Sequence, residues 1–483
     1  MERVLDEWIA KLEVENTRLR KDNDDLRADN AQLRQAIAEL KARIDQNPRN
    51  SSKPPSSEGY AKPPSRQERR ASERKAGKQK GAPGHRLEPV SDPDEVTLLD
   101  PECCADCGGS LGEADVESEE TRQVFDLPPR QAYVREYRAR TCRCSCGVKT
   151  KAEFPPEAIA TTCYGPQVRA LAVFLVCGHH LPYERASVVM SDVCGLTISP
   201  GSIATMIKEA AFGLEPFNTV VREALRNSDV VNFDETGARV AGMLFWVHSA
   251  STDQLTAYLA HRRRGRKAIE AMGIIAVTND DGEVLWTFDG IACHDGWRAY
   301  RSYEIIHALC NAHHLRELKA VVESGKHQSW ASDLIGLLVD AKSAVAKAKD
   351  EGANGLAVPL YCDILARYDT LITTGVALNP KVPGRKQSKA ANLLVRLDGQ
   401  RDDVLRFVTD FSALFDNNLA ERDIRMVKIQ QKISGCFRTT SGAENFCKIR
   451  SYISTAKKQG QSVMDVLIQL FEGNCWMPAV DTG

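Results

Sequence analysis

The sequence predicts a multidomain protein of the α/β class, and three observations support that prediction. Three short apolar runs lie within residues 229–263, with turns expected at Ala241-Gly242 and at residues 251–253. Each run is rich in β-branched, aromatic or leucine residues, which is typical of a three-stranded antiparallel meander. Segments with helical patterns precede and follow the meander. The length of 483 residues is enough for about two to four domains.

Composition constrains the binding partners and the cellular compartment of the protein. The chain has 64 basic and 65 acidic residues, so any nucleic-acid binding must depend on local basic patches rather than on a global positive field. No apolar run approaches the roughly 18 residues of a membrane span. The charged N-terminus does not resemble a signal peptide. Fifteen cysteines without a secretory signal favour reduced thiols, some of them on zinc. We therefore expect a cytoplasmic protein without a membrane partner.

Residues 1–45 show the heptad pattern of a coiled coil. Leucine recurs every seven residues from Leu5 to Leu40, and the matching a positions hold isoleucine or asparagine. Buried asparagine at a positions favours a two-stranded parallel coil, so the pattern predicts self-association. The alternative is one amphipathic helix packed on its own core, which would need a wider apolar stripe. Residues 46–87 form a linker rich in Pro and Ser. Its basic cluster from Arg66 to Lys80 either lies along phosphates or is simply solvated.

Residues 88–155 contain a candidate zinc site. Cys104 and Cys107 form a C-x2-C-G-G knuckle, and a second cluster follows about 35 residues later in TCRCSCG. Two thiolate pairs at such a separation are typical of a structural zinc ribbon with four cysteine ligands. Two of Cys142, Cys144 and Cys146 would complete the site, and Cys103 is an alternative in the first cluster. Unrelated buried thiols are the competing interpretation.

Residues 160–215 have the pattern of a helix-turn-helix. Helices are expected at residues 166–178 and 183–194, and a third helix follows Ser199, which is placed to cap it with Pro200 in its first turn. This arrangement indicates a DNA-binding region, although a plain three-helix bundle has the same pattern. The third helix offers one base, Lys208.

Two carboxylates follow apolar strand patterns. Asp234 comes directly after the first run of the meander, and Asp295 comes 61 residues later, after a strand expected at residues 284–293. If the fourth strand lies beside the first, the two carboxylates meet. The alternative is that Asp234 ends its strand and caps a turn. A fifth strand is expected at residues 304–310.

A third carboxylate lies on a helix beyond a helical insertion. Residues 319–410 are rich in Ala, Leu and Lys, with breaks near residues 352–359 and 380–384. Asn417 or Asn418 is placed to cap the next helix, and Glu421 falls in its first turns. The same helix carries Arg422, Arg425 and Lys428. An exposed ion pair between Glu421 and Arg425, four residues apart, is the competing interpretation.

Together these carboxylates predict a divalent metal site. Hard ions such as Mg²⁺ or Mn²⁺ prefer oxygen ligands, and clustered carboxylates without a cation repel one another. Asp234, Asp295 and Glu421 are the candidate ligands. Three other carboxylates are near enough in sequence to be rivals: Glu235, Asp289 and Asp423.

These motifs, taken in order, resemble the IS66-type bacterial insertion-sequence transposases. The resemblance covers nearly the whole chain. It rests on NSSKPPS (50–56), KGAPGH (80–85), the double-cysteine region, LPYERA (181–186), ISPGSIATMI (198–207), FDET (233–236), HDGWRAY (294–300), CNAHHLREL (310–318), DNNLAERDIRMVK (416–428) and GAENFCKIRSYISTAKKQG (442–460). The CxCxC spacing of the second cysteine cluster departs from a regular C-x2-C pair and leaves the zinc ligands open.

The resemblance implies an RNase H-like catalytic domain (residues 225–318 and 411–460) interrupted by a helical insertion (319–410) and followed by a tail (461–483). It implies a DDE triad of Asp234, Asp295 and Glu421. The implied activity is Mg²⁺- or Mn²⁺-dependent strand cleavage and transfer at the terminal inverted repeats of an insertion sequence. Arg422, Arg425, Lys428 and Lys208 are then candidates for DNA contact, and Zn²⁺ is structural.

The resemblance also suggests partners and a location. The partners are the element's repeats and target DNA, a second copy or more of the chain joined by the coiled coil, and accessory proteins of the same element. The location is the bacterial cytoplasm, at the nucleoid. Cys310-x2-His313 resembles a C-x2-H element of several DDE groups, with a structural role. The alternative function is a non-catalytic, zinc-containing DNA-binding regulator derived from a transposase.

Overall fold

A computed structural model of the chain describes residues 15–27, 29–30, 33–34, 89–103, 105–111, 118–125, 132–155, 157–279, 281, 283–324, 328–380 and 387–480. The predicted linker and Cys104 lie outside these residues. The chain separates into two compact units: residues 60–133 with 193–195 form one, and the remainder forms the other. Among the described helices, none combines the length and the apolar character that a membrane crossing requires.

The larger unit is built on a five-stranded sheet in the order β5-β4-β3-β8-β9. Its strands are β3 (Val230–Val240), β4 (Met243–Ser251), β5 (Thr256–His261), β8 (Ile291–His294) and β9 (Ile306–Leu309). β3, β4 and β5 are antiparallel, so the predicted meander is confirmed. Ala241 and Gly242 both have positive φ, 49° and 79°, as a tight two-residue hairpin turn requires. β8 runs parallel to β3, and β9 runs parallel to β8.

Two details of the predicted strands are wrong. β3 does not end at Asp234, because β4 pairs with it as far as Val240, so Asp234 lies within the strand and caps no turn. The strand expected at residues 284–293 is two strands. β7 (Val284–Thr287) pairs with β6 (Ala276–Thr278) in a small separate sheet, and β8 begins only after Gly290.

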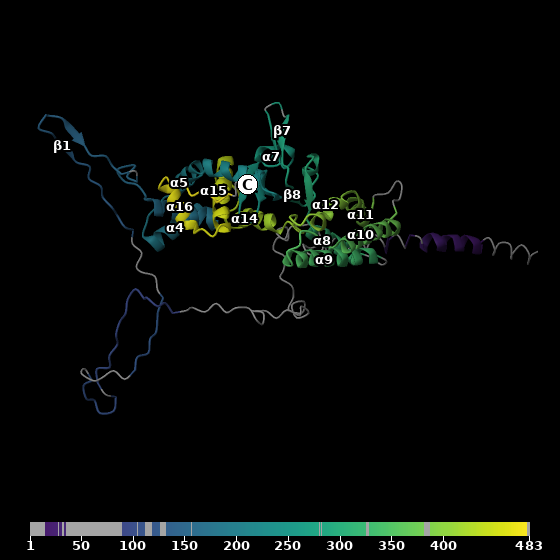
Figure 1. Ribbon diagram of the computed structural model, residues 1–483, viewed down its shortest axis with the longest axis horizontal. Coiled ribbons are helices and arrows are strands. Elements are labelled where there is room, and N and C mark those ends of the chain that lie inside the picture. Colours follow the sequence, from purple (N-terminus) through teal and green to yellow (C-terminus); the bar gives the residue numbers. More distant parts are fainter. Residues whose placement is uncertain are drawn as a thin grey trace, which may run out of the picture. The chain divides into compact units, whose positions relative to one another are not determined.

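Helices cover the sheet and extend its core (Figure 1). The helices before the sheet are α3 (Pro166–Val173), the π-helix η2 (Phe174–Gly178), α4 (Tyr183–Cys194), α5 (Pro200–Gly213) and α6 (Glu215–Arg226). Those after it are α14 (Asn418–Ser434), α15 (Thr440–Lys458) and α16 (Val463–Phe471). α14 packs on β3 and β4, and α15 packs on β5, α5 and α6. As predicted, Ser199 caps α5 by accepting the N–H of Ser202 at 3.0 Å. These helices share one apolar core with the sheet.

A second core lies in the helices between β9 and α14. They are α8 (Asn311–Ser324), α9 (Ser329–Asp350), α10 (Val358–Leu378), α11 (Lys389–Gly399), α12 (Arg401–Val404) and α13 (Arg406–Thr409). Their core includes the fully buried Trp330 and Tyr368 and reaches Ile291 and Leu309 of the sheet. The predicted break near residues 352–359 separates α9 from α10, whereas residues 381–384 of the second predicted break lie outside the described residues. The shorter elements α7 (Arg266–Met272) and η3 (Tyr300–Ser302) lie in the connections around β8.

The N-terminal residues that the structure describes, 15–27, 29–30 and 33–34, are helical. Leu19, Leu26 and Leu33 of the heptad pattern are 58–61% exposed. These three leucines are seven residues apart, as the coiled-coil prediction requires. The other heptad leucines lie outside the described residues, and self-association stays a prediction.

Gly290 allows the chain to enter β8 close to the start of β3. A Cβ at this position would lie 2.6 Å from the carbonyl oxygen of Ser228 and 2.7 Å from that of Asp229. Ile291 N–H donates to the Asp229 carbonyl at 2.7 Å. We expect Gly290→Ala to lower the free energy of unfolding by about 1–3 kcal/mol or more through this overlap. Chemical denaturation measures the change.

The matched control is Gly336→Ala in α9, where an added Cβ meets no atom within 4 Å. Alanine in an unobstructed helix interior should be neutral or stabilising by roughly 0.5–1 kcal/mol. Equal effects of the two substitutions would show that the close approach at Gly290 is not what constrains the chain.

Candidate active site

The parallel pairing of β3 and β8 brings two aspartates to the same edge of the sheet. The paired residues run from Val230↔Ile291 to Asn232↔Cys293, and each pair is 61 residues apart in the chain. Asp234 and Asp295 are separated by the same 61 residues, so each lies two residues past the last pair, Asp234 within β3 and Asp295 directly after β8. Because side chains alternate along a strand, Asp234 shares a sheet face with Asn232.

Asp234 is half-buried and other carboxylates act on it electrostatically. Its Oδ1 accepts the N–H of Glu235 at 2.8 Å. Burial raises the pKa of Asp234 well above its ordinary value, and the charges of Glu235, Asp295 and Glu421 raise it further. A carboxyl group in such company is either protonated or neutralised by a cation. The donor set is all oxygen, so these residues fit a hard divalent ion such as Mg²⁺ or Mn²⁺.

Glu235 points to the opposite face of β3 and has other partners. Its Oε1 accepts two hydrogen bonds from Arg264, at 3.0 and 2.7 Å, and its Oε2 accepts one from the Tyr300 hydroxyl at 2.8 Å. The Arg264 guanidinium lies between the rings of Trp246 and Trp297, 4.7 and 4.2 Å from their centroids. These contacts engage both oxygens of Glu235 and make it a structural carboxylate.

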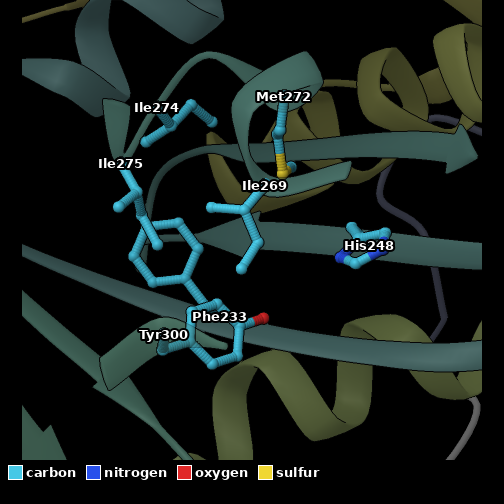
Figure 2. A pocket seen from close by; sticks show the side chains of 7 residues that line it. All are labelled: Phe233, His248, Ile269, Met272, Ile274, Ile275 and Tyr300. Carbon is cyan, nitrogen blue, oxygen red and sulfur yellow. The ribbon is translucent and has the colours of Figure 1, made fainter. Parts of the chain in front are cut away.

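The same face holds a small apolar cavity lined by Phe233, Ile269 and Tyr300, among others (Figure 2). Phe233 lies two residues before Glu235 on β3, so both side chains project to this face. The cavity is therefore a packing gap on the far side of the strand from Asp234, and it is separate from the carboxylate site.

A chain of hydrogen bonds holds the loop that carries Asp295. Asp295 Oδ1 accepts the N–H of Trp297 at 2.8 Å, and the N–H of Gly296 donates to His294 Nδ1 at 2.9 Å. Because His294 Nδ1 is an acceptor, its proton is on Nε2, which lies 3.0 Å from His307 Nδ1 and donates to it. His307 Nε2 then faces the carbonyl of Tyr303 at 3.3 Å. Burial lowers the pKa of both imidazoles, so the two rings form a neutral pair.

Asn417 attaches the start of α14 to the sheet, and this corrects its predicted capping role. The side-chain amide of Asn417 donates to the Phe233 carbonyl at 2.7 Å, directly before Asp234. Its backbone N–H donates to Cys310 Sγ at 3.1 Å. α14 has no side-chain cap from Asn417, because the side chain is engaged with β3. Asp416 Oδ1 instead accepts the N–H of Asn418 at 3.2 Å.

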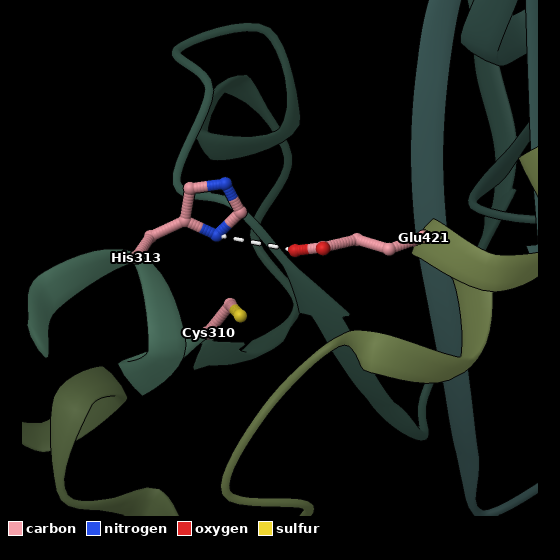
Figure 3. A group of neighbouring side chains, drawn as sticks. All are labelled: Cys310, His313 and Glu421. Atoms are coloured by element: carbon pink, nitrogen blue, oxygen red, sulfur yellow. Dashed lines mark ion pairs between the residues drawn. The ribbon is translucent and has the colours of Figure 1, made fainter. Parts of the chain in front are cut away.

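Glu421 projects from the first turn of α14 toward α8. Its Oε1 lies 3.6 Å from His313 Nδ1 and 3.7 Å from Arg316 Nη2. In Figure 3 the imidazole of His313 is directed at this carboxylate, with Cys310 beside it. Burial raises the pKa of Glu421, and Arg316 opposes that shift. Burial and Arg316 also lower the pKa of His313 to about 4, which leaves a neutral imidazole facing the carboxylate.

Glu421 pairs with His313 and Arg316 of α8, whereas the competing interpretation required a pair with Arg425. Arg422 and Arg425 are exposed on α14. Lys428 is half-buried and donates to the Gly237 carbonyl at 2.6 Å, and burial lowers its pKa. Lys208 is exposed on α5.

The remaining rival carboxylates lie elsewhere. Asp423 Oδ2 accepts hydrogen bonds from Ser251 at 2.7 Å, Thr256 at 3.1 Å and Lys458 at 2.8 Å. This network ties α14 to β4, to the residue that opens β5, and to α15. Asp289 is exposed before β8. The structure therefore places Asp295 and Glu421 within the electrostatic range of Asp234 and gives Glu235 and Asp423 structural partners.

The second cysteine cluster is folded as a tight hairpin. β1 (Thr141–Arg143) and β2 (Lys149–Lys151) are antiparallel, and Gly147, with φ 92°, closes the turn between them. Hydrogen bonds from the backbone and thiol of Cys146 lower the pKa of Cys144, as suits a thiolate ligand. Cys142 lies within β1. In the other unit, Cys107 precedes Gly108, which has φ 70°. Exposed thiols in such turns fit zinc.

Sequence reasoning did not find the residues that hold the carboxylates in place. Arg264, His307 and Arg316 act through contacts with distant segments, and nothing near them in the sequence marks those contacts. A weak signal existed for His294, which directly precedes Asp295, and for Asn417, which lies four residues before Glu421.

The fold defines a mixed α/β protein with a five-stranded mixed sheet, in which Asp295 and Glu421 act electrostatically on Asp234 of β3. Residues 161–445 match the family described as "Transposase IS66 family", and residues 101–147 match the "zinc-finger binding domain of transposase IS66". The chain belongs to the IS66 transposase family, which confirms the resemblance. The zinc-finger match also supports the prediction of zinc.

Two further similarities extend over the chain. Residues 3–88 match a family of unknown function. The uncharacterized protein y4jD of Sinorhizobium fredii is 24% identical over an alignment 444 residues long, and the alignment covers 84% of this chain and 82% of that protein.

Proposed function

We propose that the chain is a DDE transposase that binds the terminal inverted repeats of an insertion sequence and catalyses metal-dependent strand cleavage and transfer. The observation that carries the proposal is the convergence of Asp234 and Asp295, set by the register of β3 and β8, with Glu421 on α14. An antiparallel meander followed by two strands parallel to its first strand supports an RNase H-like description of the core.

The three carboxylates would hold Mg²⁺ or Mn²⁺. Such ions lower the pKa of a bound water and stabilise the attacking and leaving oxygens of a phosphodiester. Asp234 would be the ligand shared by the whole site, because the charges of both Asp295 and Glu421 affect its pKa. The loop contacts of His294 and Trp297 would fix Asp295, and the anchoring of Asn417 on β3 would fix the helix that carries Glu421. The protein's contribution is therefore mainly the placement of charge before the reaction begins.

DNA contact would come from several parts of the chain. Arg422 and Arg425 are exposed on the helix that carries Glu421 and can contact phosphates next to the site, which positions DNA without reading its sequence. Lys208 lies on the exposed face of α5. Lys428 is engaged with Gly237 and would chiefly hold α14 on β3. The zinc module, the basic linker and the helices α4 and α5 would bind the repeats, and the coiled coil would join two copies so that two DNA ends meet.

Strand cleavage and joining on DNA that carries the element's own terminal repeats tests the proposal. The zinc-loaded full chain is incubated with this DNA and Mg²⁺ or Mn²⁺, together with any accessory proteins of the element. We expect breaks at the repeat ends that leave 3′-hydroxyls, followed by joined products. Tight repeat binding without any break under these conditions would replace the transposase with a non-catalytic regulator.

The zinc site gives a separate prediction. Because Cys144 and Cys146 share one turn and Cys142 lies within a strand, we expect Cys144→Ser to lose most bound zinc and Cys142→Ser to keep it. Cys104 and Cys107 would be the other two ligands. Elemental analysis of the purified full chain measures zinc per molecule, and a gel-shift assay measures the accompanying loss of repeat binding. Zinc loss on replacing Cys142, with full zinc content in Cys144→Ser, would contradict this assignment.

A further inference from the structure

His313 presents an unused ligand atom to the carboxylate site. It lies in the first turn of α8, with its side chain 18% exposed. Its Nδ1 is buried, and so is Glu421 Oε1, and neither atom has a hydrogen-bond partner. The two atoms face one another at 3.6 Å (Figure 3). A buried polar atom without a hydrogen bond is costly. The two facing atoms are therefore suited to bind a common ligand that lies between them.

The neighbouring Cys310 is less suited to bind an ion. Its sulfur lies within 4.8 Å of the ligand atoms of His313 and Glu421, but it already accepts the N–H of Asn417. That bond holds the residue from which α14 begins. Cys310 therefore positions the helix of Glu421, and His313 is left as the side chain with a free lone pair.

The charge around His313 also favours a cation. Asp295 acts electrostatically on the imidazole from the side of β8, and Glu421 lies on the side of α14. His313 therefore contacts the carboxylate of Glu421 and lies within the electrostatic range of Asp295. Arg316, at 3.7 Å from Glu421, is the cation on the same helix. Neighbouring ligands of a six-coordinate ion with bonds of about 2.1 Å are about 3 Å apart, so a small side-chain rotation would bring Nδ1 and Oε1 to that separation.

We propose that His313 is a nitrogen ligand of a divalent ion held by Asp295 and Glu421. This inference rests on the proposed function, because it concerns the same metal centre. An imidazole in the ligand set favours transition-metal ions, whereas an all-oxygen set suits Mg²⁺. The centre then binds Mn²⁺ more tightly than Mg²⁺, and His313 is a source of that preference.

Pulsed electron paramagnetic resonance on the zinc-loaded full chain with Mn²⁺ tests the assignment. A histidine ligand gives a ¹⁴N modulation on the Mn²⁺ signal. We expect this modulation in the wild type and its loss in His313→Gln, with Mn²⁺ still bound about tenfold more weakly. Mg²⁺ affinity, measured by competition, should change less than about threefold.

Two control variants isolate His313. His261→Gln changes a half-buried histidine at the end of β5 whose Nδ1 accepts the N–H of Arg263, and it should keep the ¹⁴N modulation. Cys310→Ser should also keep the modulation. If Cys310→Ser and His313→Gln both lose the ion entirely, the ion is held chiefly by that pair of side chains and the proposal is overturned.

Asp234→Asn separates failure of the inference from failure of the proposed function. If Mn²⁺ binding depends on Asp234 but no ¹⁴N modulation is seen, or the modulation survives in His313→Gln, the triad centre stands and His313 is not a ligand. If Mn²⁺ binds equally well without Asp234, or binds nowhere in the wild type, the triad centre is wrong and the assignment of His313 fails with it.

Discussion

Asp234→Asn is expected to abolish strand cleavage without destabilising the metal-free protein. Cleavage should fall at least about 10³-fold, a loss of roughly 4 kcal/mol of transition-state stabilisation, because an amide cannot supply a charged metal ligand. Stability should stay equal or rise, since the half-buried carboxyl of Asp234 is affected by the charges of Glu235, Asp295 and Glu421, which raise its pKa. The amide oxygen of asparagine can still accept the N–H of Glu235. Removing a like charge from such a cluster relieves repulsion.

Thermal unfolding in the presence of chelator and a gel-shift assay with repeat DNA complete this experiment. Because a strong chelator also strips zinc, the comparison is made between variants treated identically. Asp289→Asn changes an exposed carboxylate before β8 and should leave both cleavage and stability unchanged. Asp295→Asn and Glu421→Gln should lose cleavage in the same way. A less stable Asp234→Asn protein that still cleaves DNA would mean that Asp234 is a structural carboxylate.

Arg264→Ala should produce the largest loss of stability among the charged residues around the site. The side chain of Glu235 is 1% exposed and that of Arg264 is 36% exposed. Removing Arg264 leaves Glu235 with only the Tyr300 hydroxyl and empties the space between Trp246 and Trp297. Breaking a fully buried pair costs about 3–5 kcal/mol. We expect about 2–4 kcal/mol here, because solvent screens the exposed part of the arginine.

The stability loss in Arg264→Ala should depend on pH. Burial already raises the pKa of Glu235, and the charge of Arg264 opposes that shift, so the variant should raise this pKa further. A carboxyl group whose folded pKa lies above its unfolded value destabilises the fold as pH rises. The deficit should therefore be full at neutral pH and shrink as pH falls toward the ordinary range of carboxyl groups. Denaturation at several pH values measures it.

Arg262→Ala, an exposed arginine two residues earlier, is the matched control and should change stability by less than about 0.5 kcal/mol. A deficit in Arg264→Ala that is constant across pH would mean that lost packing between the two tryptophans, rather than the charge of Glu235, accounts for the effect.

Much of the sheet was predictable because its determinants are local. The apolar runs and the Ala241-Gly242 turn define the meander, and the spacing of 61 residues between Asp234 and Asp295 equals the register of the parallel pair. The limits of β3 were not predictable from apolar residues alone. Residues 234–240 are mixed in polarity, and they remain in the strand because β4 continues beside them. The break at Gly290 depends on close approach to Ser228 and Asp229, which only the folded chain reveals.

In the candidate site, too, some features have local sequence determinants and others depend on contacts in the folded chain. Each proposed metal carboxylate lies in a short motif that sequence comparison can find. The residues that hold these carboxylates in place do not lie in such motifs. His307 of β9 contacts His294, and Arg264 in the loop after β5 contacts Glu235. Asn417 was expected to cap its own helix, yet its amide binds Phe233, 184 residues earlier in the chain. Such contacts are selected by the packing of whole elements, and no local pattern encodes them.

We propose that one site, formed by Asp234, Asp295 and Glu421, carries out both cleavage and joining. The most direct test supplies a donor DNA whose repeat ends are already cut to 3′-hydroxyls and measures joining to target DNA in Mg²⁺. We predict that the wild type joins these ends and that Asp234→Asn, Asp295→Asn and Glu421→Gln bind them without joining. Joining of precut ends at the wild-type rate by any of the three variants would contradict the account for that carboxylate.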